Sequence, residues 1–322
     1  MANRMYRDRL KFITCRLASR LAGCTLLLCL LSLISLQAHA KTLIILLSDR
    51  HHIYQDLANA IQTDIFTDYQ IVALEEYNSN TLQPPGIFLA IGTRACEAAL
   101  QLTEQHSDIV CTFLPSQTFL RLLEQYRTDS STANRRVTAV FLDQPLQRQI
   151  HLARLIDPEA ESIGTVFGNS SIYQQQAYET LSLAAGFNAQ YAFLDERQNP
   201  VQVLTPIIQR SDIFLALPDS ASFNRNVTRW SLYITLRNRV PLIGYSASYA
   251  EAGAVISLYT TPQQLAGQTN QVLNQIAGTD VMPEPAYPLE FTLNINQSAA
   301  RTLRLDLPEI EVLTQHLTEV LP

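Results

Sequence analysis

The chain has little lysine, glycine and cysteine, and each shortage narrows the possible functions. Only two of its 322 residues are lysine, and the ten glycines form neither the G-x-G-x-x-G nor the G-x-x-x-x-G-K-[ST] pattern of nucleotide-binding loops. Histidine and cysteine do not occur at the spacing of a zinc site, so we predict neither a metal nor another cofactor. We interpret the adjacent His51 and His52 as part of a polar loop, because neighbouring residues on one element do not point together.

The first 40 residues have the composition of an export signal. Six basic residues precede the apolar run TLLLCLLSLISL, and the triplet Ala38-His39-Ala40 follows it. A basic head, a short apolar core and an A-x-A end are typical of a secretory signal peptide. The apolar run is shorter than the roughly 20 residues of a membrane-spanning helix. We therefore expect cleavage after Ala40, a periplasmic location and no membrane insertion of the mature chain.

Removal of the leader makes the protein strongly acidic. The leader holds six of the 23 basic residues and one of the 29 acidic residues, so the mature chain has a net charge of −11. Such a surface repels phosphate backbones, and nucleic acid is not an expected partner. The remaining 282 residues exceed one ordinary domain and suit two lobes with sizeable cores.

Two cysteines, Cys96 and Cys111, follow the leader. In an oxidising compartment they form a disulfide if their geometry permits it. The alternative is a pair of buried free thiols, which behave as small apolar residues. Sequence alone does not settle the pairing, so both readings stay open.

One unit recurs along the mature chain: an apolar run, a turn of small or polar residues, and a helix-like stretch. The apolar runs cover residues 42–47, 87–91, 108–114, 162–167, 212–217 and 240–243. Strands that alternate with helices predict βαβ units and parallel sheets buried on both faces. Ligands of such sheets bind beyond the carboxyl ends of the strands, where helix starts offer backbone N–H groups. Each single Ser, Thr, Asn or Asp there is also an ordinary helix cap, but the set as a whole indicates a binding cleft.

Four segments carry a resemblance to a known family. They are FLDQPLQRQIHLARLIDPEAESIGTVFG, ALPDSASFNRN, RVPLIGYSASYAEAGAVISLYTTPQQLAGQ and FTLNINQSAARTLRLDLP. Together they resemble the ABC transporter substrate-binding protein family, the group that includes tryptophan- and tyrosine-binding proteins. The resemblance covers most of the mature chain and is weakest from about residue 42 to residue 85.

The resemblance implies a type I periplasmic-binding-protein fold. This is an α/β fold of two Rossmann-like lobes with parallel sheets, three hinge crossings and a ligand clamped between the lobes. We place the first crossing near Asp143 and another in the proline-rich stretch MPEPAYPLE. On this reading, residues 41–142 and 249–287 form the first lobe, and residues 143–248 and 288–322 form the second.

Family positions also nominate ligand contacts in this chain. The nominated residues are Thr93, Ser116, Asn169, Ser170, Ser171, Asp219, Tyr245 and Ser246. In amino-acid-binding relatives an acidic group binds the ligand ammonium, and Asp219 is the candidate for this contact. Hydroxyl groups bind the ligand carboxylate, and Thr93 and Ser170 are the candidates for that contact. Arg94, and Ser220-Ala221 after the Pro-Asp turn, depart from the aromatic-amino-acid pattern. An anionic or larger polar ligand is therefore equally open.

The expected function is delivery of a small polar solute to the membrane permease of an ABC importer. One alternative is a periplasmic sensing module that reports the ligand to a membrane receptor or kinase. A distant alternative is a serine hydrolase, because Gly244-Tyr-Ser246 resembles part of a nucleophile elbow. Ser248 stands where that motif has glycine, and His316 is the only later histidine. The chain is accordingly expected to be a binding protein and not an enzyme.

Overall fold

The computed structural model describes residues 42–66, 68–77, 86–101, 107–126, 136–219 and 224–320. The expected signal peptide lies outside these residues. Among the residues that the structure describes, no helix is long and apolar enough to cross a membrane.

The first sheet is parallel throughout and contains the strands β1 (Leu43–Leu47), β2 (Tyr69–Ala73), β3 (Ile87–Ile91), β4 (Asp108–Thr112) and β5 (Val137–Val140). Their order is β2-β1-β3-β4-β5. Every residue of β1, β3 and β4 is buried, which explains their continuous apolar runs. The sequence pattern did not predict β2, because this edge strand exposes three of its five residues.

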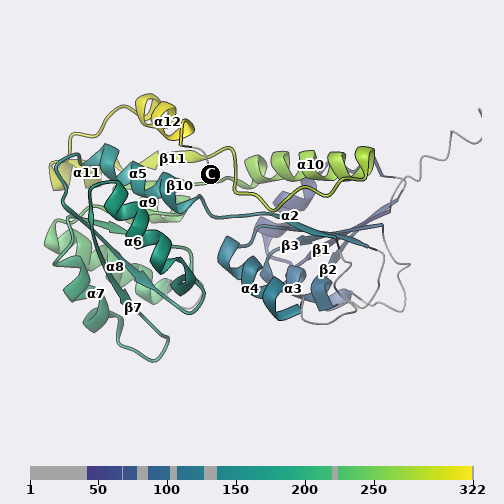
Figure 1. Cartoon of the computed structure of the whole chain (residues 1–322), viewed down its shortest axis with the longest axis horizontal. Coiled ribbons are helices and arrows are strands. Elements are labelled where there is room, and N and C mark those ends of the chain that lie inside the picture. Colours follow the sequence, from purple (N-terminus) through teal and green to yellow (C-terminus); the bar gives the residue numbers. More distant parts are fainter. Residues whose placement is uncertain are drawn as a thin grey trace, which may run out of the picture. The chain divides into compact units, whose positions relative to one another are not determined.

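Helices cover both faces of the first sheet (Figure 1). On one face lie α2 (His52–Asn59) and α10 (Pro262–Thr279), and on the other α3 (Thr93–Gln101) and α4 (Ser116–Tyr126). Alternate residues of each strand join the two cores, as the period of a strand requires. A short 3-10 helix, η1 (Leu74–Glu76), follows β2. Helix α10 is far in sequence from the strands it covers, so the chain returns to this sheet late.

The second sheet contains β6 (Ser162–Phe167), β7 (Asn188–Phe193), β8 (Ile213–Leu215), β9 (Leu242–Gly244), β10 (Ile256–Tyr259) and β11 (Thr292–Ile295). Their order is β11-β10-β9-β8-β6-β7. The strands pair in parallel except β11, which is antiparallel to β10. The predicted alternation of strands and helices is therefore confirmed in both sheets.

Two sets of helices cover the second sheet. One core includes α5 (Leu146–Ile156), α6 (Gln175–Ala184) and α12 (Ile310–Thr318), and the other includes α7 (Pro200–Ile208), α8 (Arg225–Asn238) and α9 (Ala247–Ala252). A 3-10 helix, η2 (Ser171–Gln174), precedes α6. Helix α11 (Gln297–Leu303) packs on Val255 in a small core of its own.

The chain passes between the two sheets three times. It leaves the first sheet after β5, returns between β10 and α10, and leaves again between α10 and β11. We had assigned residues 249–259 to the first lobe, and the strand pairing corrects this, because β10 is hydrogen-bonded to β9 and β11 of the second sheet. The second crossing thus comprises residues 260–261, later than the sequence indicated.

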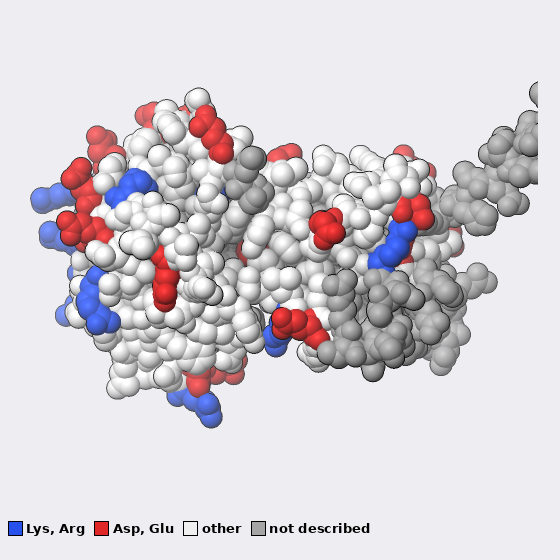
Figure 2. Space-filling view, in the orientation of Figure 1, with Lys and Arg blue, Asp and Glu red and all other residues white. Residues whose placement is uncertain are grey.

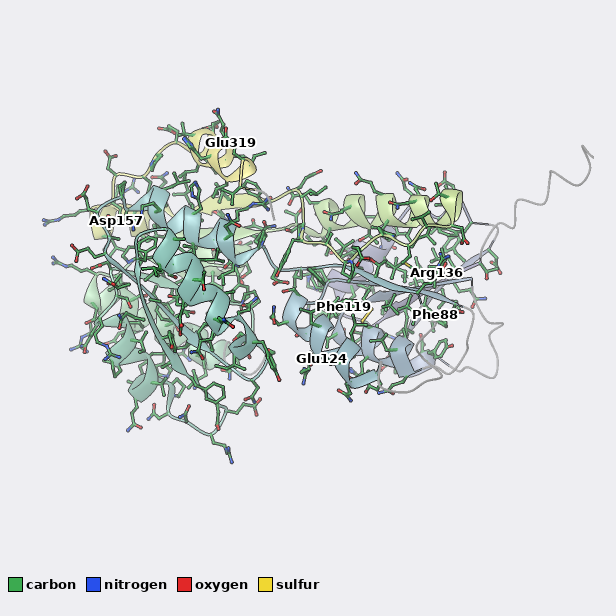
Figure 3. All side chains as sticks on the ribbon, viewed as in Figure 1. Phe88, Phe119, Glu124, Arg136, Asp157 and Glu319 are labelled. Atoms are coloured by element: carbon green, nitrogen blue, oxygen red, sulfur yellow. A yellow bond between two sulfur atoms is a disulfide. The ribbon has the colours of Figure 1, made fainter. Side chains whose placement is uncertain are left out.

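Cys96 and Cys111 form a disulfide that joins α3 to β4. Their Cα atoms lie 5.5 Å apart, and both residues are fully buried. Figure 3 shows the yellow bond close to the labelled Phe88 and Phe119, which belong to the same core. Of the two readings left open above, the structure contains the bonded one.

Candidate ligand-binding site

The carboxyl ends of the parallel strands collect the polar residues at one edge of each sheet. In the first sheet this edge follows β1, β3 and β4, and in the second it follows β6, β8 and β9. We call them the first edge, residues 48–54, 92–94 and 113–116, and the second edge, residues 168–171, 218–219 and 244–249. All eight nominated residues lie on these edges.

Gly92 and Thr93 form a tight turn on the first edge. Gly92 has φ +90° and donates its N–H to the Thr112 carbonyl oxygen at 2.8 Å. A Cβ at this position would lie 2.5 Å from Ser48 Oγ, so only glycine fits. Ser48 Oγ in turn accepts the Ala95 N–H at 3.0 Å. This packing fixes Thr93 as the first residue of α3, at its positive end.

Charged and aromatic groups gather beside that turn. Tyr54 packs edge-to-face on Phe113 with 5.6 Å between the ring centroids, and Phe113 has φ 60°. Burial raises the pKa of Tyr54, the charge of Asp49 raises it further, and the charge of Arg94 opposes both. Both charges therefore act on the same phenol. The sequence pattern missed Tyr54 and Phe113, since an aromatic residue after a strand looks like core.

Ser116 is engaged by its own protein. Its N–H and its Oγ donate to the two carboxylate oxygens of Asp143, at 2.6 Å and 2.7 Å. Tyr287 Oη donates to Ser116 Oγ at 3.1 Å. Burial raises the pKa of Asp143 to about 6, although the hydrogen bonds from Ser116 work in the opposite direction. The nominated serine thus holds the first and third crossings against α4, and its hydroxyl is already in use.

The second edge brings three nominated residues together. Asp219 is buried, and its Oδ2 accepts the N–H groups of Ser170 at 3.1 Å and Ser171 at 2.7 Å. Ser171 Oγ accepts the Gly168 N–H at 2.9 Å. Asn169, between these groups, is exposed. The carboxylate therefore shapes the turn after β6, a role that the sequence did not predict for Asp219.

The half-buried Tyr245 and the buried Tyr249 form an aromatic pair on the same edge. Their ring centroids lie 5.0 Å apart, and Tyr249 Oη lies 3.1 Å from Thr228 Oγ1. Burial raises the pKa of Tyr245 to about 12, and the nearby charge of Asp219 raises it as well. Gly244 permits this packing, because a Cβ there would lie 2.3 Å from the Tyr249 Cβ.

Ser246 does not have the surroundings of a hydrolytic nucleophile. Its Oγ lies 2.9 Å from Ser248 Oγ, so the neighbour of the hydroxyl is another hydroxyl. His316 Nδ1 lies 2.8 Å from the Val312 carbonyl oxygen in its own helix, α12. A serine nucleophile needs a hydrogen bond to a general base. The partner of Ser246 is Ser248, and His316 is bonded within its own helix, so these contacts provide no such base.

Elements that follow the two edges approach each other in space. Helix α4, which starts at Ser116, contacts η2, which starts at Ser171. The N–H groups of both serines are already used, since Ser116 donates to Asp143 and Ser171 donates to Asp219. The contact therefore brings polar turns of the two sheets close together, with their backbone geometry fixed by the two carboxylates.

Metal ligation finds little support in the residues present. Within the ranges that the structure describes, no three His, Cys, Asp or Glu residues lie close enough together to hold an ion. His51 instead caps α2, where its Nδ1 accepts the Ile53 N–H at 3.4 Å. Its ring centroid is 4.3 Å from that of His52.

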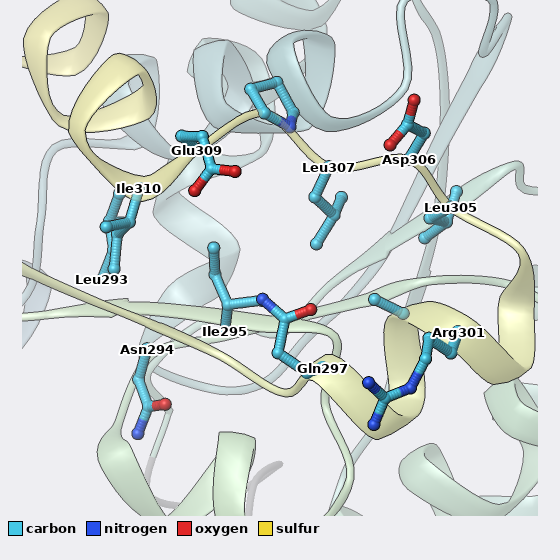
Figure 4. Close-up of a pocket in the computed structure, with 12 residues that line it drawn as sticks. Leu293, Asn294, Ile295, Gln297, Arg301, Leu305, Asp306, Leu307, Glu309 and Ile310 are labelled. Carbon is cyan, nitrogen blue, oxygen red and sulfur yellow. The ribbon is translucent and has the colours of Figure 1, made fainter.

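A cavity of about 570 Å³ lies elsewhere, between β11, α11 and the start of α12. Figure 4 shows Leu307 and the carboxylate of Glu309 directed into it, with Arg301 on the opposite wall. None of its lining residues belongs to the first or second edge. The volume of this cavity therefore does not locate the candidate site, which we derive from the strand ends.

Charge is spread thinly over the surface. On the face shown in Figure 2, acidic and basic groups are scattered among uncharged ones and form no single large patch of one sign. A broad phosphate-binding surface is not visible there, in keeping with the acidic composition of the mature chain.

Two α/β sheets of mostly parallel strands, joined by three crossings and carrying polar edges, define the class of type I periplasmic binding proteins. The model of the family "ABC transporter substrate binding protein" matches residues 78–318, and the chain belongs to this family. Comparison with curated protein sequences found no match.

Solved structures share the fold at low sequence identity. A conserved domain protein from Vibrio cholerae is 18% identical with a TM-score of 0.61, covering 85% of this chain and 98% of its own. An ABC domain from Streptococcus pneumonia in complex with L-Trp is 14% identical with a TM-score of 0.61, covering 85% and 97%. The ligand-free, open structure of a substrate binding protein from Clostridium difficile is 14% identical with a TM-score of 0.64, covering 84% and 97%.

Proposed function

We propose that this protein binds a small polar solute between its first and second edges and delivers it to the membrane permease of an ABC importer. One observation carries the proposal: α4, which follows the first edge, contacts η2, which follows the second edge. Ligand contacts from both sides favour a closed state over an open one, which is how a hinged protein signals occupancy to a partner. Family membership supports the same role.

The proposed contacts include the eight nominated residues, with their roles refined by the geometry. Thr93 offers its hydroxyl and its N–H group to an acidic part of the solute, and Ser170 offers its hydroxyl. Asp219 already accepts two N–H groups, so we assign it to shaping the turn as well as facing the ligand. Asp49 and Arg94 are the charges at the first edge that remain for recognising a zwitterion or an anion.

The proposed place of action is the periplasm. Substrate-binding proteins of ABC transporters work outside the cytoplasmic membrane, and the basic head, apolar core and A-x-A end of residues 1–40 support export by a cleaved signal peptide. Edman sequencing of the protein purified from the periplasm tests this, since the mature N-terminus is expected at Lys41.

A thermal-shift panel tests solute binding directly. The mature protein is heated with amino acids, purines, sugars and organic anions, each in large excess. A true ligand at a hundredfold excess over Kd adds about 2.7 kcal/mol to the free energy of unfolding. If no compound raises the Tm, solute binding as proposed here is wrong.

Matched variants then locate the site. Thr93→Val and Ser170→Ala are expected to reduce the ligand-dependent shift while leaving the ligand-free Tm almost unchanged. Thr314→Val is the control, because that exposed hydroxyl donates to the Ile310 carbonyl oxygen of its own helix, α12. Equal shifts in all three variants would place the ligand elsewhere.

Transport is tested separately from binding. Solute uptake by cells that lack the protein is expected to fall, and a permease and an ATPase are expected to be encoded nearby. A neighbouring receptor or kinase gene, with normal uptake, would favour the sensing alternative instead.

A further inference from the structure

The second crossing depends on side chains for its connection to the other two. The first and third crossings are paired through their backbones, because the Phe141 N–H donates to the Ala286 carbonyl oxygen at 3.0 Å and the Ala286 N–H donates to that of Ala139 at 2.9 Å. In the part of the chain that the structure describes, no backbone hydrogen bond links residues 260–261 to either crossing.

Gln264 joins the second crossing to the end of the third, because it contacts both Thr261 and Phe291, but only the second and third are linked in this way. The first crossing is joined to both by Gln144. This buried side chain belongs to the first crossing, and its Nε2 donates to Thr260 Oγ1 at 2.6 Å and to the Glu290 carbonyl oxygen at 3.3 Å. Thr260 Oγ1 also donates to the Glu290 carbonyl oxygen at 3.3 Å. One amide group thus contacts all three crossings.

Arg148 holds the oxygen atom of the same Gln144 amide. Its Nη1 donates to Gln144 Oε1 at 2.6 Å and to the Pro288 carbonyl oxygen at 3.2 Å, and the guanidinium lies 5.0 Å from the Phe291 ring centroid. The bond from Arg148 orients Gln144 so that its NH₂ group faces Thr260, because Oε1 is committed to the guanidinium.

The same guanidinium reaches the C-terminal helix. Arg148 Nε donates to the Leu317 carbonyl oxygen at 3.2 Å, and Nη2 donates to that of Val320 at 3.1 Å. These carbonyls lie at the negative end of α12, which suits a buried cation that has no carboxylate acceptor among the described residues. Since α12 packs in the core of the second sheet, the connection extends from the crossings into that sheet.

We propose that Gln144 is a positioning residue for ligand binding: it couples the three crossings, and Arg148 ties them to α12, so that the two sheets change their relative orientation as one cooperative step. The inference rests on the proposed closure around a solute. Buried amides and guanidinium groups are costly to leave unpaired, so the bonds change together instead of one at a time.

Distance measurements on the ligand-free protein test the coupling. Spin labels are attached to Glu124→Cys in α4, labelled in Figure 3, and to Arg229→Cys in α8, both exposed positions. The native cysteines are buried in a disulfide and do not react. Pulsed electron–electron double resonance then reports the distribution of distances between the two labels, and so between the lobes that contain the two sheets.

Thr260→Val removes the hydroxyl at the centre of the network and is expected to change the ratio of the distance populations about fivefold, the effect of one lost buried hydrogen bond. Thr260→Ser restores the hydroxyl and should restore the wild-type distribution. Thr235→Val is the matched control, since this buried hydroxyl donates to the Ser231 carbonyl oxygen within α8 and contacts no crossing.

Gln144→Glu provides a second variant that keeps the bond to Arg148 but loses the donor to Thr260. It should shift the populations in the same direction as Thr260→Val. If both variants give the distribution of Thr235→Val, the coupling is wrong. Because no ligand is present in this experiment, a negative solute panel would contradict the proposed function and leave this result standing.

Discussion

The two edges of the candidate site differ in how far their polar groups are satisfied by the protein itself. On the second edge, Asp219 accepts two N–H groups and Tyr249 lies within hydrogen-bond distance of Thr228. On the first edge, Arg94 is exposed and forms no ion pair within the described part of the chain, and Tyr54 is only partly buried. The second edge therefore holds its buried carboxylate in place, while the first edge combines the fixed hydroxyl of Ser116 with the exposed charge of Arg94.

We expect the two edges to contribute differently to ligand recognition. Preorganised groups lose little conformational freedom on binding, so the second edge provides a rigid surface for closure. In the proposed binding mode, charges at the first edge would select the ligand, because an unmatched charge would be desolvated without a partner. The comparison predicts large stability effects from variants of structural bonds and small ones from variants of the ligand-facing charges.

The largest expected effect concerns the Cys96–Cys111 disulfide, which lies in the core of the first sheet. The residues that build the second sheet contain no cysteine, so no such bond stabilises that sheet. The bond closes a 15-residue separation, and its removal by Cys96→Ala/Cys111→Ala should lower the free energy of unfolding by about 3 kcal/mol. Urea unfolding measures this. Reductant should lower the stability of the wild type equally, and should leave the double variant unaffected. Insensitivity of the wild type would mean that the cysteines are free thiols.

Asp143 should give the wild type a pH-dependent stability. Its pKa is raised from 3.8 unfolded to about 6 folded, so the folded state binds the proton more tightly. The contribution of Asp143 to stability is then fully present below pH 3.8 and is lost as the pH rises through about 6, by about 2–3 kcal/mol in all.

Asp143→Asn keeps a polar partner for Ser116 and removes the titration. The difference between wild type and variant, measured by urea unfolding across this pH range, should shift in favour of the variant as the pH rises. A constant difference would show that the carboxyl group is not perturbed in the folded state.

Asp219→Ala ranks next, with an expected loss of about 2 kcal/mol, because it leaves the buried N–H groups of Ser170 and Ser171 without their acceptor. Asp219→Asn retains an acceptor and should recover most of the loss. Asp49→Ala, the acidic counterpart on the first edge, should change thermal stability by less than about 0.5 kcal/mol. Equal losses for the two Ala variants would remove the contrast between the edges.

The sequence predicted those parts of the fold that depend on burial. Strands β1, β3, β4 and β6 are apolar because helices cover both of their faces, and their bounds nearly match the expected runs. Edge strand β2 was not predicted, because three of its five residues are exposed and burial does not require a continuous apolar run there. Strand β10 falls in the expected first lobe, because its place in the second sheet depends on pairing with a strand at residues 292–295.

Positions on the two edges were predictable, but the partners of their side chains were not. Gly92, Ser170 and Asp219 follow apolar runs, and parallel strands bring such positions to one edge. The acceptor of the Ser171 N–H is 48 residues away, and Gln144 and Thr260 are 116 residues apart. No local pattern links such pairs, so roles that depend on them needed the fold.

A smaller contrast is expected between two tyrosines. Tyr249→Phe deletes a hydroxyl that is within hydrogen-bond distance of Thr228 and should lower the free energy of unfolding by about 1 kcal/mol. Tyr54→Phe deletes a hydroxyl without a hydrogen bond in the described residues, so the Tm should stay close to that of the wild type. Differential scanning calorimetry of both variants decides. A larger loss from Tyr54→Phe would show that the first edge is as internally bonded as the second.

Arg94→Gln should have the smallest effect on stability and a clear effect on binding. A cation in the first turn of α3 opposes the helix dipole, so its removal should leave the Tm unchanged or raise stability by a few tenths of a kcal/mol. Loss of a charge-assisted hydrogen bond to an acidic solute should weaken affinity about tenfold or more. Calorimetric titration with whichever compound stabilises the wild type measures this, with exposed Arg229→Gln in α8 as the control. Equal affinity in both variants would mean that Arg94 does not face the ligand, and that charge selection must come from the second edge.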